Sequence, residues 1–252
     1  MPTLDRGFHG TRRRPGTAVG ETRGHETSII VGVLDELLLK VEAGHRLPTE
    51  PWFLVIDPGS SGTHAILGFT GVNVIVTDLD PAWVARLLPE RDLSAPLQPP
   101  FLSAMEHKLD RRVNNLDLLL VGGRSAGPPS LGLEVVDCDH PRVRRARRYR
   151  TENIVYQADG GVIVIGRGLG GRWEVGIEVD EGARGAGLGR ALAAAARHLV
   201  PEDRPVWAQI APANAASVRA FLAAGYVPVG AEALLVERAD DCRRGAPGTI
   251  GS

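Results

Sequence analysis

The stretch "EVDEGARGAGLGRALAAAARHLV", residues 178–200, decides how the second half of the chain is interpreted. Gly185, Gly187 and Gly189 alternate in it and lead directly into a run of strong helix formers. Glycines carry no Cβ, so consecutive backbone N–H groups can point into one concavity, and the N-terminus of the next helix adds a favourable field for an anion. The sequence therefore predicts a phosphate-binding loop in front of a helix over 190–199.

The sequence argues against two other kinds of phosphate-binding loop. No Lys-Ser or Lys-Thr pair follows Gly189, so the loop is not a Walker loop. A formal G-x-G-x-x-G match occurs at 166–171, but the next residues, 172–180, alternate as in a strand. A dinucleotide fingerprint requires a helix at that point, because the helix N-terminus receives the pyrophosphate. We expect residues 166–171 to form a hairpin turn.

Two motifs resemble the GNAT superfamily of N-acetyltransferases. The spacing Arg184-x-x-Gly187-x-Gly189, after a strand and before a helix, resembles the family's pyrophosphate loop. The segment "NAASVRAFLAAGY", residues 214–226, resembles its second signature, a capping Asn, a helix, and a Gly followed by an aromatic residue. The resemblance covers 160–236 closely and 131–238 in outline.

The resemblance implies an α/β fold with a mixed sheet and acetyl-CoA as co-substrate. It implies that the loop binds the CoA pyrophosphate and that the main chain around 177–179 meets the thioester carbonyl. The pantetheine arm would lie where this strand splays from the strand at 205–211. The residues expected to bind acetyl-CoA are Ile177, Val179, Arg184, Gly185, Ala186, Gly187, Leu188, Gly189, Arg190 and Asn214.

The implied reaction is direct transfer of an acetyl group, in a ternary complex, to a primary amine of a small-molecule or peptide acceptor. Glu174 and Glu178 are the candidate general bases, and the family position is closest to Glu174. They lie four residues apart, so they share a face if the strand is regular, whereas a β-bulge would separate them. Burial beside an apolar thioester would raise the pKa of such a carboxylate. The alternative is that either glutamate faces solvent or pairs with an arginine.

The proton donor for the leaving thiolate departs from the family pattern. Many members carry Tyr seven residues after the capping Asn, where this chain has Phe221, which cannot donate a proton. Tyr149, Tyr156 or water could serve instead, whereas Tyr226 occupies a position that usually packs. This departure leaves a second hypothesis open, a non-catalytic acyl-CoA-binding or regulatory module.

The segment "HPRVRRARRYR", residues 140–150, contains six arginines. They could bind nucleic acid, contact an acidic acceptor or the 3′-phosphate of CoA, or form a solvated surface paired with carboxylates. A net charge of −1 and an aromatic content of 5% argue against nucleic acid, and we expect no such partner.

The apolar runs, the cysteines and the metal-capable side chains bear on localisation and cofactors. No run approaches the roughly 18 to 20 apolar residues of a membrane span, and the N-terminus has no apolar stretch typical of a signal peptide. The two cysteines lie far apart, which suits a reducing cytoplasm. "DCDH", residues 137–140, has metal-capable side chains without a second cluster, and Asp139 is more simply the N-cap of a helix. We expect a cytoplasmic monomer or homodimer without a metal.

The predicted organisation has two folded units. Residues 28–124 form a smaller mixed α/β domain of unknown role, with three neighbouring antiparallel strands between 51 and 78, a helix over 101–113 and a strand over 116–122. Residues 125–130 form a Gly/Pro-rich linker. Residues 131–238 form the GNAT-like domain, which ends in a strand pair. Disordered tails are predicted at 1–27 and 239–252.

Overall fold

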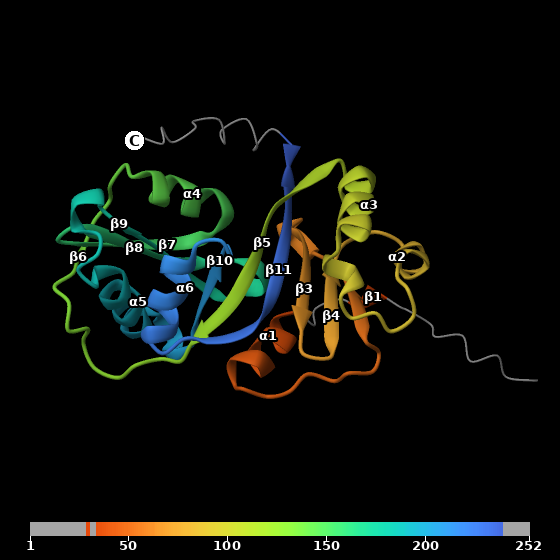
Figure 1. Ribbon diagram of the computed structural model, residues 1–252, viewed down its shortest axis with the longest axis horizontal. Coiled ribbons are helices and arrows are strands. Elements are labelled where there is room, and N and C mark those ends of the chain that lie inside the picture. Colours follow the sequence, from red (N-terminus) through yellow and green to blue (C-terminus); the bar gives the residue numbers. More distant parts are fainter. Residues whose placement is uncertain (1–28, 31–33, 239–252) are drawn as a thin grey trace, which may run out of the picture.

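The computed structural model describes residues 29–30 and 34–238, and the predicted tails lie outside them. This part of the chain forms one eleven-stranded mixed sheet with six α-helices on its two faces (Figure 1). The strand order is β1-β2-β4-β3-β11-β5-β10-β9-β8-β7-β6. The predicted α/β class with a mixed sheet is confirmed. None of the described helices is long and apolar enough to cross a membrane.

The first half of the chain supplies one end of the sheet. Its elements are β1 (Ile29–Ile30), α1 (Leu34–Glu42), β2 (Phe53–Ile56), β3 (His64–Phe69), β4 (Val72–Val76), α2 (Pro81–Leu87), α3 (Pro99–Leu109) and β5 (Arg111–Gly122). Alternate residues of β3 pack on opposite layers: Leu67 joins the core under α1, and Ile66 joins the core under α2 and α3. Two separate apolar cores therefore sandwich this end of the sheet.

Two predictions for this half are wrong. The strands β3 and β4 form the expected antiparallel hairpin, but β2 pairs with β4 in parallel. The strand β4 therefore lies between β2 and β3. Residues 57–63, which connect β2 to β3, do not form a hairpin loop between neighbouring strands. The second error concerns α3, which ends at Leu109 because Asp110 adopts a left-handed conformation with φ of 50°. The strand β5 consequently starts five residues earlier than predicted, at Arg111 instead of 116.

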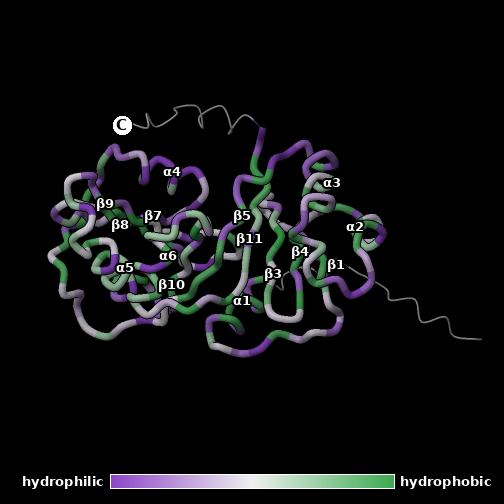
Figure 2. Tube along the Cα trace, in the orientation of Figure 1, coloured by the Kyte–Doolittle hydropathy of each residue, from purple (hydrophilic) through white to green (hydrophobic). Residues whose placement is uncertain are grey.

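The second half supplies the other end of the sheet. Its elements are β6 (Glu134–Val135), α4 (Pro141–Tyr149), β7 (Thr151–Ala158), β8 (Gly161–Arg167), β9 (Trp173–Val179), α5 (Leu188–Leu199), β10 (Val206–Ile210), α6 (Ala215–Ala223) and β11 (Val227–Glu237). Val162 and Val164 of β8 pack under α4, whereas Ile163 and Ile165 pack under α5 and α6. The helices α4 and α5 therefore cover opposite faces of the sheet. Figure 2 shows α4 as largely hydrophilic.

One turn and one helix cap in this half test the predictions. Residues 166–171 connect the antiparallel strands β8 and β9, so the predicted hairpin is confirmed and the dinucleotide alternative is excluded. The N-cap of α4 is His140, whose Nδ1 accepts from the N–H of Arg142 at 3.1 Å. Asp139 pairs instead with Arg144, so its prediction as the cap is wrong.

The last strand lies in the middle of the sheet. The strand β11 pairs antiparallel with β3 on one side and with β5 on the other, and β5 pairs in turn with β10 (Figure 1). It is one long strand with register shifts at 228/230 and 233/235, not the strand pair predicted from the sequence. The predicted domain boundary at 125–130 follows β5 in a loop and stays a prediction.

Candidate active site

The glycine loop forms an open N-terminus for α5. Gly187 is the N-cap with φ of 85°, and Gly185 has φ of 83°. Both values favour glycine, and an added Cβ at either position would meet open space. No side chain of the described residues caps α5, so its first N–H groups keep their binding capacity. The loop is therefore shaped to receive an anion.

The predicted CoA-binding residues lie in three places: the glycine loop, the end of β9 and the start of α6. The loop holds Arg184 to Arg190, of which Leu188 packs on the core and Ala186 is exposed. The half-buried side chains of Ile177 and Val179 pack towards the same core from β9, the strand that leads into the loop. Asn214 caps α6, and its Oδ1 accepts from the N–H of Ser217 at 3.1 Å.

A slot opens between β9 and β10. The two strands pair in parallel only at Glu174 and Trp207. All five residues of β10 pair with β5 on its other side, whereas β9 continues to Val179 without a further pair to β10. A cavity of about 870 Å³ occupies this place. Its lining includes Gly176 and Ile177 of β9, residues 208–211 at the end of β10, and Asn214, Ser217 and Phe221 around α6. The position of the slot is the one expected for a pantetheine arm.

Beyond the slot, the cavity has one wall from each half of the chain. The wall from the second half is the polar side of α4 with Tyr149 and Arg150. The first half contributes residues 61–63, between β2 and β3, together with Arg111, Asn114, Asn115 and Asp117 of β5. Residues 61–63 and these β5 residues thus complete the site, although the sequence did not predict that they lie near α4.

Glu174 and Glu178 lie on the same face of β9. The strand pairs with β8 residue by residue, from Gly161 opposite Val179 to Arg167 opposite Trp173, so no bulge separates the two glutamates. Glu178 is partly exposed, and its Oε2 accepts from Arg142 Nη2 at 2.6 Å and Nε at 3.1 Å. The two candidate bases therefore both point to the side covered by α4.

Glu174 is almost fully buried, with 4% exposed. Arg150 Nε donates to its Oε2 at 2.8 Å, while Arg172 Nε and Gln209 Nε2 donate to its Oε1 at 2.8 and 2.7 Å. Burial raises the pKa of Glu174, but the charges of Arg172 and Arg150 outweigh it, and the pKa is lowered. The predicted increase is wrong for this residue, because two guanidinium groups stabilise the ionised form.

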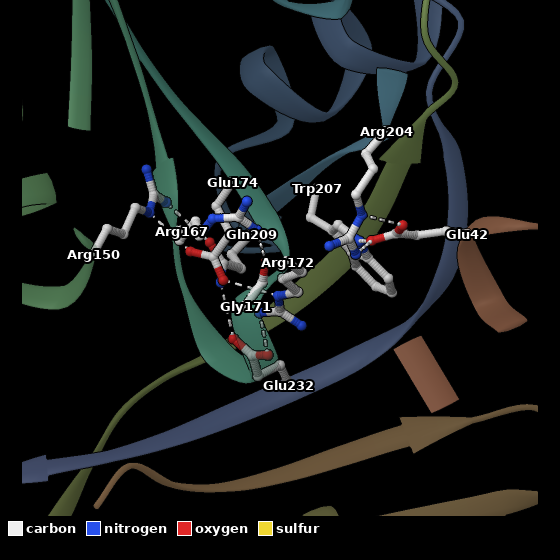
Figure 3. A network of polar contacts seen from close by, with 10 residues as sticks. All are labelled: Glu42, Arg150, Arg167, Gly171, Arg172, Glu174, Arg204, Trp207, Gln209 and Glu232. Atoms are coloured by element: carbon white, nitrogen blue, oxygen red, sulfur yellow. Dashed lines mark hydrogen bonds and ion pairs between the residues drawn. The ribbon is translucent and has the colours of Figure 1, made fainter. Parts of the chain in front are cut away.

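A buried network extends from Glu174 to the centre of the sheet (Figure 3). Arg172 is fully buried and donates from Nη2 to Glu232 Oε2 on β11 at 2.5 Å. Gln209 Nε2 also reaches Glu232 Oε1, at 3.2 Å, and Arg172 lies over the ring of Trp207. Glu232 has one guanidinium where Glu174 has two, and burial raises its pKa. The network connects Arg172, which precedes β9, with Gln209 on β10 and Glu232 on β11.

Asp117 is a cavity carboxylate that the sequence analysis missed. It lines the cavity from β5, directly opposite Glu232 in the pairing with β11, and its Oδ1 accepts from Asn115 Nδ2 at 2.8 Å. Burial raises the pKa of Asp117. The available signal was a single carboxylate in the otherwise apolar run "LDLLLVG".

The tyrosines differ in what they contact. Tyr149 lines the cavity, and Tyr156 packs against the core under α5, where burial raises its pKa. Tyr226 is buried, donates to the carbonyl of Ala193 at 3.1 Å and stacks edge-on against Phe221 with ring centroids 4.8 Å apart. Tyr226 is thus a packing residue, as expected. In the described ranges, no cluster of side chains could hold a metal ion.

Comparison with known proteins gives one family and several remote structures. Residues 148–226 match the model of the acetyltransferase (GNAT) family. No curated protein matches. Similar solved structures are a GCN5-related N-acetyltransferase from Kribbella flavida (17% identity, TM-score 0.35, 54% of this chain and 63% of that one) and one from Sphaerobacter thermophilus (12%, 0.34, 53% and 54%).

A third similar structure is a tandem GNAT protein from the clavulanic acid biosynthesis pathway (14%, TM-score 0.33, 55% of this chain and 58% of that one). The similarity thus spans less than two thirds of each of these three solved chains. The matched family segment, in contrast, runs from the end of α4 to Tyr226 and includes β9, the glycine loop, α5, β10 and α6. The resemblance to the GNAT acetyltransferase family that the sequence predicts is therefore confirmed over residues 148–226.

Proposed function

We propose that the protein is an acetyl-CoA-dependent N-acetyltransferase that acts on a primary amine by direct transfer in a ternary complex. The observation that carries this proposal is the uncapped N-terminus of α5 beside the slot between β9 and β10. The loop offers backbone N–H groups to a pyrophosphate, and the slot continues into the cavity between the two halves of the chain. Acetyl-CoA would supply the activated acyl group.

The chain's own groups can assist at both ends of the transfer. Beyond Glu174, alternate backbone N–H groups of β9 point into the slot, where they can donate to the thioester carbonyl oxygen. Ile177 and Val179 lie on this segment. The amine must lose a proton before its nitrogen attacks, and the departing thiolate accepts one. Tyr149 is the tyrosine on the cavity wall that could donate it.

Three carboxylates are candidates for the base. Glu174 and Glu178 remain proposals, but each already forms ion pairs with arginine side chains. Asp117 forms no ion pair among the described residues and has a raised pKa, so its basicity fits proton abstraction best. We therefore rank Asp117 first as the base and give Glu174 a role in positioning Arg150 and Gln209.

Replacing Asp117 by Asn should lower kcat/KM for the amine by about a hundredfold or more, the usual contribution of a general base. The base must be deprotonated, so activity falls as pH drops through its pKa. Since burial raises that pKa, the acid limb of the wild-type pH profile should lie above the aspartate reference of about 3.9. The limb should disappear in the variant. A profile unchanged in Asp117→Asn but lost in Glu178→Gln would assign the base to Glu178.

The proposed activity itself is tested by calorimetric titration with CoA and by thiol release from acetyl-CoA across a panel of amines. We expect CoA binding and amine-dependent release. CoA binding without release for any amine would favour the second hypothesis, a non-catalytic acyl-CoA-binding module, which Phe221 in the slot keeps open. Absence of CoA binding would refute both.

A further inference from the structure

The walls of the cavity carry an excess of positive charge. Three carboxylates line it, Asp117, Glu174 and Glu237. Seven arginines line it as well, Arg111, Arg142, Arg145, Arg147, Arg148, Arg150 and Arg167. The protein as a whole has a net charge of −1, so this excess is local to the cavity.

Most of these arginines already have carboxylate partners. Arg142 pairs with Glu178, and Arg150 pairs with Glu174. Arg147 pairs with Asp137 at 2.5 Å, and Arg167 pairs with Glu152 and Glu202. Two lining arginines, Arg111 and Arg145, form no ion pair with any carboxylate in the described part of the chain.

Arg145 is exposed on α4, and its guanidinium lies 5.4 Å from the ring centroid of Tyr149. A contact with the face of an aromatic ring orients a guanidinium without using its N–H groups. The five donors of Arg145 thus stay available in the plane of the group. This geometry suits a planar or tetrahedral oxyanion.

Arg111 approaches from the opposite wall. It is half-buried at the start of β5, and its neighbours on the cavity wall are the amides of Asn114 and Asn115 and the hydroxyls of Ser61 and Thr63. These neighbours are neutral hydrogen-bonding groups that complement an anion. Glu237 also lines the cavity and lies opposite Arg111 in the pairing of β5 with β11, but no ion pair joins the two side chains. Asp117, on the same strand, supplies a negative charge within the field of Arg145, where an ammonium could be held.

The arginines of α4 lie on the face of the sheet opposite α5 and its glycine loop, away from where the nucleotide part of CoA would bind. The helix α4 packs on one face of the sheet, and α5, whose N-terminus carries the glycine loop, packs on the other. The loop residues 184–190 do not line this cavity. The positive walls therefore belong to the acceptor side of the slot.

We propose that the acceptor is an amine that also carries an anionic group, a carboxylate or a phosphate, and that Arg111 and Arg145 bind this group. The inference rests on the proposed acetyl transfer and specifies its substrate class. It disfavours polyamines and other purely cationic acceptors, since an unpaired arginine repels them. Asp117 and the bound anion would hold the two ends of the acceptor.

Matched amines test the substrate class by thiol release at fixed acetyl-CoA. The carboxylate arm compares β-alanine with β-alaninamide, and the phosphate arm compares aminoethyl phosphate with ethanolamine. Spermidine serves as the cationic control. We expect kcat/KM to be about tenfold or more higher for the anionic member of at least one pair. This is the difference expected when the neutral member lacks one charge-assisted contact. A preference for the neutral members or for spermidine would overturn the inference and leave the transferase proposal standing.

Variants assign the role to residues. Arg111→Gln and Arg145→Gln should each raise KM for the anionic amine by about tenfold, with KM for acetyl-CoA unchanged. The matched control is Arg144→Gln on the same helix, because Arg144 pairs with Asp139 and does not line the cavity. A raised KM for acetyl-CoA in Arg145→Gln would show that this arginine contacts CoA and would refute the proposal.

A binding measurement keeps the inference testable if no amine of the panel reacts. Glutarate and methylphosphonate are titrated calorimetrically into the wild-type protein and the same three variants. We expect at least one anion to bind the wild type and Arg144→Gln, and to bind about tenfold more weakly to Arg111→Gln and Arg145→Gln. Failure of both anions to bind the wild type, or equal affinity in all variants, would refute the anion site. Failure to bind CoA would instead refute the proposed function.

Discussion

Replacing Gly187 by Glu is expected to abolish CoA binding while the fold is retained. Gly187 caps α5 at the open end of the helix, and an added Cβ meets no atom within 4 Å. The Cβ of the glutamate therefore finds open space, and the side chain places a carboxylate where we propose that the pyrophosphate binds. Like charges in contact cost several kcal/mol, so the dissociation constant should rise by about a hundredfold or more.

The matched control is Gly187→Gln, which has the same size and the same backbone strain. A residue with a Cβ at φ of 85° costs about 1–2 kcal/mol in either variant, and thermal unfolding should show equal losses of stability. Calorimetric titration with CoA then isolates the effect of charge. Equal affinity in Gly187→Glu and the wild type would refute the assignment of the loop.

Replacing Arg172 by Met is expected to give the largest loss of stability. The side chain is fully buried between Glu174 and Glu232, and its removal leaves two buried carboxylates with Arg150 as their remaining guanidinium partner. Breaking a buried ion pair by removing one partner costs about 3–5 kcal/mol. Urea unfolding at pH 7 should reveal this decrease in the free energy of unfolding.

The loss should depend on pH in a defined direction. In the wild type the pKa of Glu174 is lowered, so its ionised form stabilises the fold above the ordinary glutamate pKa, and this contribution is lost on acidification. In Arg172→Met, Glu174 and Glu232 stay buried without that guanidinium, so the pKa of each should rise. Protonation of the two carboxyl groups should then stabilise the folded state of the variant. The difference between variant and wild type should therefore shrink as pH falls below about 4.3.

A triple variant controls for the shape of the core. Arg172→Met with Glu174→Gln and Glu232→Gln removes the three charges together, so most of the stability lost at pH 7 should return. If Arg172→Met alone is as stable as the wild type at pH 7, the network makes no net contribution to the fold.

The parts of the site encoded by short segments could be predicted from the sequence. The spacing of Gly185, Gly187 and Gly189 predicted the start of α5, which the structure places at Leu188. Asn214 was predicted as a cap and caps α6. Caps and glycine turns depend on a few neighbouring residues, so their chemistry is visible in a local pattern.

The parts of the site that depend on long-range pairing could not be predicted. Asp117 and Arg111 reach the cavity because β5 lies between β10 and β11, and no periodicity in 111–122 specifies those neighbours. The pKa of Glu174 likewise depends on Arg150, 24 residues away in sequence. An apolar alternation predicts a strand, but it does not predict which strand lies beside it.

The central position of β11 has a consequence for the order in which the chain can fold during synthesis. Both neighbours of β11, the strands β3 and β5, are complete more than a hundred residues before residues 227–237 are made. Until then, each of them has at least one edge without its native partner, and such edges are sites of wrong association. Ribosomal release of the last described strand is thus the event that closes the sheet, and slow translation of the second half would prolong the interval in which these strand edges are exposed.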